Sequence, residues 1–133
     1  MATVTPTLTI VSTDLLSDSL SISATCSITA SHTSGLARAA ITSTAKGTAS
    51  GQVTIGTAGE FTSPNYLFIK NTAAFHATNN IITVFDDTNS DVETIHIPGG
   101  QFAFVPVFSG NTLKAFASTS GTVVEWMIFG TNA

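Results

Sequence analysis

Residues 19–29 alternate between hydroxyl-bearing and apolar side chains. Ser19, Ser21, Ser23, Thr25, Ser27 and Thr29 take the odd positions, and Leu20, Ile22, Ala24, Cys26 and Ile28 take the even ones. Side chains of a β-strand point to opposite faces with period two, so this pattern predicts a long strand with one buried face. The polar face carries no Lys or Glu, although charge is the usual protection of exposed strands against aggregation. Such a neutral face indicates either an inert surface or a surface that another subunit covers.

A second alternating segment covers residues 3–11, with threonines at the odd positions 3–9 and apolar residues at positions 4, 8 and 10. Pro6 has no N–H for a strand ladder, which predicts an edge strand or an extended N-terminal arm over residues 1–12. Residues 13–133 are then expected to form a single β-sandwich domain. The hydroxyl faces of the two segments supply the predicted interface residues, which are Thr3, Thr5, Thr7, Ser19, Ser21, Ser23 and Thr25.

The rest of the chain shows short apolar segments separated by turn signals. Strands are expected at 66–70, 81–85, 92–97, 101–108, 111–117 and 123–129. Segment 101–108 is apolar on both sides, which predicts a strand covered on both faces. Residues 36–40 are the one stretch that leans toward helix, and residues 45–55 fit a loop or weak strands equally. The pattern predicts an all-β, antiparallel β-sandwich or jelly-roll-like fold with about eight short strands and little or no helix.

Charge is sparse throughout the chain. Charged residues make up 9% of the 133 residues, against roughly 25% in ordinary soluble proteins. The net charge is −4, and the four Lys and Arg residues are scattered, so no basic stripe is expected to bind nucleic acid. No apolar run approaches the roughly 18 residues of a membrane-spanning helix, so no membrane association is expected.

Two features indicate synthesis in a reducing cytoplasm. The first residues lack the basic start and apolar stretch of a signal peptide. Cys26 is the single cysteine, which excludes an intrachain disulfide. Its place on the apolar side of the alternation predicts a small core residue.

Few residues suggest a metal-binding or catalytic site. Asp87, Asn89 and Asp91 imitate the start of a calcium-binding loop, but Val92 stands where such a loop needs Gly, and Pro98 where it needs Glu. A solvated turn is therefore the preferred interpretation, and a calcium site is the alternative.

Other types of site find less support in the chain. The histidines, His32, His76 and His96, lack the paired spacing of zinc ligands. The sequence has no nucleophile elbow and no phosphate-binding loop. We expect no catalytic residue, no cofactor and no enzymatic activity.

The aromatic residues are predicted to lie in the core, because aromatics that alternate along strands are usually buried. They are Phe102, Phe104, Phe108, Phe116, Trp126 and Phe129. An interface is the alternative for them, since the chain has little charge. Tyr66, Phe75 and Trp126 are the candidates for stacking on a sugar.

Several segments of the C-terminal half resemble those of a known class of proteins. Segments 66–72, 97–106, 113–117 and 123–130, in this order, resemble small β-sandwich virion proteins of tailed bacteriophages, particularly capsid cement (decoration) proteins and small tail-associated proteins. The resemblance covers roughly residues 65–129 and implies a non-enzymatic structural protein present in many copies.

The resemblance also implies partners and a location. We expect a homo-oligomer, with a trimer favoured because it suits local threefold positions on a capsid, and contact with the major capsid protein or another virion protein. The expected location is the virion, after synthesis in the host cytoplasm. A tail or baseplate role is one alternative, and a carbohydrate-binding or host-adhesion module is another.

Overall fold

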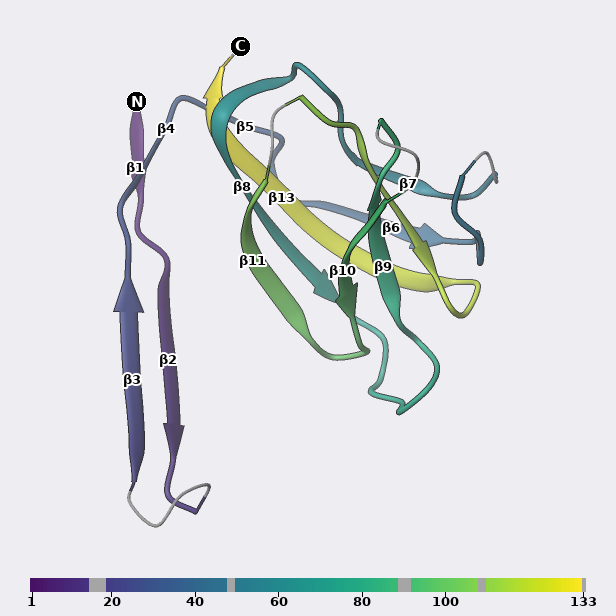
Figure 1. Cartoon of the computed structure of the whole chain (residues 1–133), viewed down its shortest axis with the longest axis horizontal. Coiled ribbons are helices and arrows are strands. Elements are labelled where there is room, and N and C mark those ends of the chain that lie inside the picture. The colour runs from purple at the N-terminus through teal and green to yellow at the C-terminus, as the bar shows by residue number, and fades with distance from the viewer. Residues whose placement is uncertain (15–18, 48–49, 89–91, 108–109, 133) are drawn as a thin grey trace.

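A computed structural model of the chain describes residues 1–14, 19–47, 50–88, 92–107 and 110–132 (Figure 1). The fold is all-β with antiparallel pairing, as the alternation predicts, and contains no helix in these ranges. The described residues form thirteen strands, which are β1 (Ala2–Val4), β2 (Thr7–Ser12), β3 (Leu20–Thr25), β4 (Ile28–Ala30), β5 (His32–Thr33), β6 (Ala37–Ile41), β7 (Val53–Gly56), β8 (Phe61–Asn71), β9 (Ile82–Asp86), β10 (Val92–Ile97), β11 (Phe102–Val107), β12 (Leu113–Ala117) and β13 (Thr122–Asn132).

Two antiparallel sheets pack together as a β-sandwich, which we call the body. One sheet has the order β10-β9-β12-β7. The other has the order β11-β8-β13-β5, with β6 also paired to β13. The long strand β13 is central, because it pairs with β8 on one side and with both β5 and β6 on the other (Figure 1).

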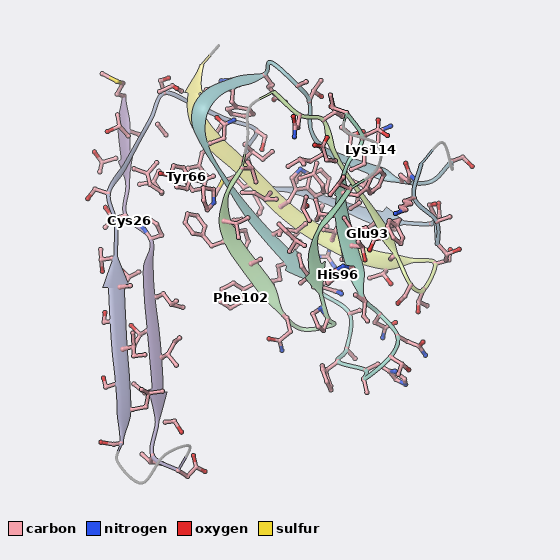
Figure 2. The ribbon with its side chains drawn as sticks, viewed as in Figure 1. Cys26, Tyr66, Glu93, His96, Phe102 and Lys114 are labelled. Atoms are coloured by element: carbon pink, nitrogen blue, oxygen red, sulfur yellow. The ribbon has the colours of Figure 1, made fainter. Side chains whose placement is uncertain are left out.

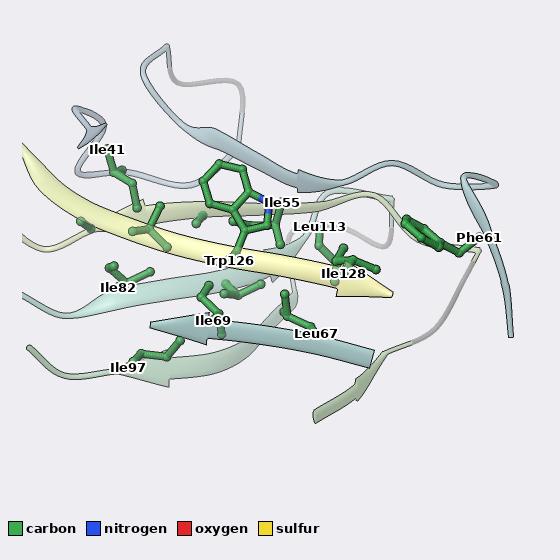
Figure 3. Close-up of a cluster of buried hydrophobic side chains, with 14 residues drawn as sticks. Ile41, Ile55, Phe61, Leu67, Ile69, Ile82, Ile97, Leu113, Trp126 and Ile128 are labelled. Atoms are coloured by element: carbon green, nitrogen blue, oxygen red, sulfur yellow. The ribbon is translucent and has the colours of Figure 1, made fainter. Parts of the chain in front are cut away.

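The main core lies between these two sheets (Figure 3). Alternate residues of facing strands enter it, as period two requires. Its buried members are Ile41, Ile55, Phe61, Leu67, Ile69, Ile82, Val84, Ile97, Leu113, Ala115, Ala117, Val124, Trp126 and Ile128. All of them come from β6 onward, so the described residues that precede β6 contribute nothing to this core.

The predicted number of about eight strands is too low. The two alternating segments each break into two strands, because Thr5–Pro6 separates β1 from β2 and Cys26–Ser27 separates β3 from β4. In the helix-leaning stretch 36–40, residues 37–40 also belong to a strand. Its residues pair with β13 from Ala37 opposite Trp126 to Ile41 opposite Thr122, so sheet pairing overrides the local preference.

The strand covered on both faces is β9, where every residue from Ile82 to Asp86 is buried. The prediction that segment 101–108 is covered on both faces is wrong. Strand β11 lies at the edge of its sheet and pairs with β8 alone. Ala103, Val105 and Val107 pack against the core, while Phe102 on the other face is 60% exposed.

The Pro-Gly-Gly sequence at residues 98–100 predicts a tight turn, and the structure has one there, in which the N–H of Gln101 donates to the carbonyl of Pro98 at 3.1 Å. Gly100 has φ of 75°, a conformation that glycine adopts without strain. Its N–H donates to the carbonyl of Asn71 at 3.1 Å. Gly99 is confined for a different reason, since a Cβ atom there would overlap the carbonyl oxygen of Ala74.

Gly99→Ala is therefore expected to lower the free energy of unfolding by about 2 kcal/mol, because the neighbouring backbone must move. Urea denaturation followed by circular dichroism measures this change. Gly100→Ala is the matched control, and its backbone strain predicts a smaller loss of about 1 kcal/mol. A Gly99→Ala variant as stable as the wild type would contradict this account of the turn.

The N-terminal strands form a projecting hairpin (Figure 1). Strands β2 and β3 pair with each other and stand beside the body, while β1 and β4 pair at the base of the hairpin. Between the two pairs the ladder is interrupted on both strands, and one bond spans the gap, from the N–H of Cys26 to the carbonyl of Pro6 at 3.3 Å. The boundary expected after residue 12 falls between two strands of this hairpin.

The prediction of a buried face on residues 19–29 is wrong for most of its length. In β3 the side chains of Ile22 and Ala24 are exposed. The first buried apolar residue along the segment is Ile28 in β4, which is 4% exposed. Cys26 is also exposed, not a core residue. The alternation does form a strand, but the hairpin projects from the body and no described segment of the chain packs on its apolar side.

Candidate interaction surface

The register of the hairpin assigns each side chain to a face. Directly opposed residues share a face, and Leu8 lies opposite Ala24 while Ile10 lies opposite Ile22. We call this side the apolar hairpin face; it comprises Leu8, Ile10, Leu20, Ile22 and Ala24, with Ser12 opposite Leu20. We call the other side the hydroxyl hairpin face; it comprises Thr7, Thr9, Val11, Ser21, Ser23 and Thr25.

The apolar hairpin face is open to solvent. Leu8, Ile10 and Ile22 are 51%, 44% and 47% exposed. No Lys, Arg or Glu occurs among residues 1–37, and the two aspartates of this region, Asp14 and Asp18, follow β2 and precede β3. The strands themselves therefore lack the charges that usually keep exposed edges apart. An apolar, uncharged surface is typical of interaction sites.

The hydroxyl hairpin face gathers four of the predicted interface residues. Thr7, Ser21, Ser23 and Thr25 lie on it together, and the hydroxyls of Thr7 and Thr25 are 3.2 Å apart across the strands. The other three are exposed elsewhere: Thr3 is in β1, Thr5 lies in the break before β2, and Ser19 precedes β3. Sequence reasoning identified this face but did not consider the apolar hairpin face as a candidate contact surface, although the same alternation produces both.

A groove of about 580 Å³ separates the base of the hairpin from β11. Its sheet side is lined by Gln101, Phe102 and Phe104, and its hairpin side by Pro6, Thr7, Leu8, Ala24, Thr25 and Cys26. Figure 2 shows Phe102 extending from β11 on the side that faces the hairpin. The groove is thus bordered by apolar groups from two separate parts of the fold.

The sheet side of the groove belongs to an aromatic layer on the outer face of the sheet. Tyr66 stacks on Phe104 with ring centroids 5.9 Å apart, and Phe104 stacks on Phe129 at the same spacing. Strands β1 and β4 cover one end of this layer, where Ile28 and Phe129 are each 4% exposed. The other end, at Phe102, is uncovered.

The aromatic residues predicted for the core therefore divide among several environments. Trp126 is in the main core, and Phe129 is in a second buried cluster with Ile28 and Ala30. Phe104 and Phe116 are half-buried, and Phe102 is exposed. Phe108 lies outside the described residues.

Most of the predicted calcium site lies outside the described residues, because Asn89 and Asp91 are not among them. The carboxylate of Asp87 pairs with the ammonium of Lys114 at 2.7 Å. The neighbouring Asp86 accepts a hydrogen bond from the N–H of Thr88 at 2.8 Å and another from the side chain of Asn111. Among the described residues no three His, Cys, Asp or Glu side chains are grouped as metal ligands would be.

The histidines have separate local partners. The ring of His32 lies against Phe61 with centroids 5.0 Å apart. His76 accepts hydrogen bonds from the N–H groups of Thr78 and Asn79. His96 lies beside Glu93, with 3.4 Å between Nε2 and the carboxylate, and Figure 2 places both on β10.

No helix within the described ranges is long and apolar enough to cross a membrane. The chain was also compared with known proteins. No family model, curated protein or solved structure matches it. The interaction surface must therefore be interpreted from its own geometry and chemistry.

Proposed function

We propose that this chain is a non-enzymatic structural protein of a phage particle, acting as a capsid cement or decoration protein that stabilises the shell through subunit contacts. The observation that carries the proposal is the projecting hairpin, whose two faces are both exposed and whose strands are uncharged. A two-stranded hairpin is marginally stable at best on its own. A hairpin of this kind suits a protein that works in contact with neighbours.

The assignment to a phage particle rests on the resemblance of residues 65–129 to small virion proteins of tailed phages. On this proposal the chain forms a homo-oligomer, with a trimer as the expected state, and contacts the major capsid protein or another virion protein. The body supplies a closed sandwich with its own core, and the hairpin supplies the contact surface. A tail or baseplate protein would use the body and the hairpin in the same way.

The carbohydrate-binding alternative gains little from the geometry. Sugar sites use exposed aromatic rings beside polar groups. Tyr66 is stacked between other rings, and Trp126 is 9% exposed. Phe75 is exposed on the loop after β8, but a single ring on a loop is a weaker platform than a set of rings.

Mass spectrometry of phage particles purified from cells that carry this gene tests the proposal. Peptides of the chain should be present in intact, density-purified particles at many copies each. Recovery of the chain exclusively in the unassembled soluble fraction would contradict a structural role. Difference imaging of particles with and without the chain then separates a capsid position from a tail position.

A further inference from the structure

We propose that the groove between the hairpin and β11 is filled by the hairpin of a second copy of this chain. The exchange is reciprocal, so that each copy gives its hairpin to its neighbour and receives one in its own groove. This inference rests on the proposed function as a structural subunit and names the partner of the hairpin. It holds in any closed cyclic oligomer, a trimer included.

The exposed area of the chain supports a missing partner. A folded monomer of 13.7 kDa is expected to expose about 6,600 Å² of surface. This chain exposes 7359 Å², an excess of roughly 760 Å². A standard protein–protein interface buries about 800 Å² on each partner. The excess therefore matches what one stable subunit contact would remove from solvent.

The body of the same chain does not cover the whole apolar hairpin face. Leu8 and Ala24, near the base, line the groove, whereas Ile10 and Ile22, farther along the hairpin, are not among its lining residues. Each copy thus has an unfilled groove at the base and an uncovered apolar segment farther out. These two features complement each other between copies, because the outer half of one hairpin can occupy the groove of another.

The groove offers partners for both faces of an inserted hairpin. Its hairpin side includes Leu8 and Ala24 of the apolar hairpin face and Thr7 and Thr25 of the hydroxyl hairpin face, and its sheet side includes Phe102 and Phe104. In the proposed exchange, the inserted hairpin places its apolar face against Leu8 and Ala24 and its hydroxyl face on the aromatic layer at Phe102 and Phe104.

This arrangement accounts for the absence of charge on both faces of the hairpin. A Lys or Glu on the hydroxyl hairpin face would be buried without a partner against the Phe102 ring, which is unfavourable. Hydroxyls avoid this penalty when they satisfy each other across the strands, as Thr7 and Thr25 do. The methyl groups of the threonines add apolar contact with the aromatic layer.

Ile22→Lys tests the inference with the full-length chain. Light scattering should show the wild type as an oligomer, with a mass at least twice 13.7 kDa. An unpaired charge in the contact should weaken association by about a hundredfold or more, so the Ile22→Lys variant should run as a monomer. Ile22 is 47% exposed in the single chain, so the variant should keep its fold, which near-ultraviolet circular dichroism of Trp126 reports.

Ser120→Lys is the matched control, because it adds the same charge to an exposed position between β12 and β13 and should leave the mass unchanged. The thiol of Cys26 gives an independent readout. It lines the groove, so a thiol reagent should modify it slowly in the wild type and quickly in the Ile22→Lys variant.

Three results would overturn the inference: a monomeric wild type at high micromolar concentration, an Ile22→Lys variant with the wild-type mass, or equal Cys26 reactivity in the two proteins. The presence of the chain in the particle is decided separately, by particle mass spectrometry, so a failure of the exchange can be told apart from a failure of the structural role.

Discussion

Replacing Asn71 by alanine is expected to lower the free energy of unfolding by about 3 kcal/mol. Asn71 ends β8 and is fully buried. Its side-chain amide donates to the carbonyls of Asn80 at 2.6 Å and Ile97 at 2.9 Å, and its Oδ1 accepts from the N–H of Ala73 at 3.0 Å. The variant removes the side-chain partners of these backbone groups; the hydrogen bond to Ile97 is buried, and the other two are part-buried.

Chemical denaturation of the variant measures this loss. Asn79→Ala is the matched control, because Asn79 is exposed on the same loop and its removal should change the stability by less than about 0.5 kcal/mol. Asn71→Asp provides a second comparison, since it keeps the shape and loses both donors, and it should also be destabilised. Equal stability of Asn71→Ala and Asn79→Ala would contradict the role of Asn71 in joining β8, the following loop and β10.

Trp126→Ala is expected to have the largest effect, a loss of about 4 kcal/mol. Trp126 is the single tryptophan and extends from β13 into the main core, where it packs among residues of both sheets (Figure 3). Its removal takes away a large apolar surface and leaves a cavity that close-packed strands cannot fill. A loss of this size is a large part of the stability of an ordinary domain, which is about 5–15 kcal/mol.

Far-ultraviolet circular dichroism during urea denaturation measures this effect, since the variant lacks the fluorescent residue. Phe102→Ala is the control. Phe102 is also aromatic but is 60% exposed, so its replacement should lower the stability by less than about 1 kcal/mol. A similar loss in both variants would show that the core is not where the structure puts it.

The sequence carries enough information to predict the all-β class and most strands of the body. Period two and turn residues act locally, so segments such as 92–97 and the Pro98–Gly100 turn can be recognised without tertiary contacts. Strand β6 escaped this reasoning because Ala-rich residues have little preference of their own, and pairing with β13 decides their conformation. Asn71 escaped it because its three hydrogen bonds depend on a loop and a second strand.

The hairpin shows the limit of the alternation itself. Period two predicts that Ile22 and Ser23 lie on opposite faces, and the structure places them so. The pattern does not specify which protein covers the apolar side. The sequence led to the assumption that the chain's own core does so, and the same assumption placed Cys26 in the core. Both errors have one physical origin, since apolar alternation is equally favoured by burial against a neighbouring chain.

The hydroxyl face of residues 19–29 was recognisable as unusual because it lacks charge, and that observation remains the strongest clue to function in the sequence. The structure adds a location for it, on a hairpin outside the body (Figure 1). It also adds a second exposed face that is apolar.

Excision of the hairpin tests the central claim, that the hairpin rather than the body holds copies of this chain together. Residues 7–25 are replaced by an Asn-Gly turn, which can close between Pro6 and Cys26 because these residues already share a backbone hydrogen bond. No described residue of the excised segment belongs to either buried cluster, so the body should unfold at the same urea concentration as before. The measurement is the molar mass by light scattering of the full and excised chains. We predict an oligomer for the full chain and a monomer for the excised chain; an excised chain that keeps the oligomeric state, or a full chain that is monomeric, would contradict the claim.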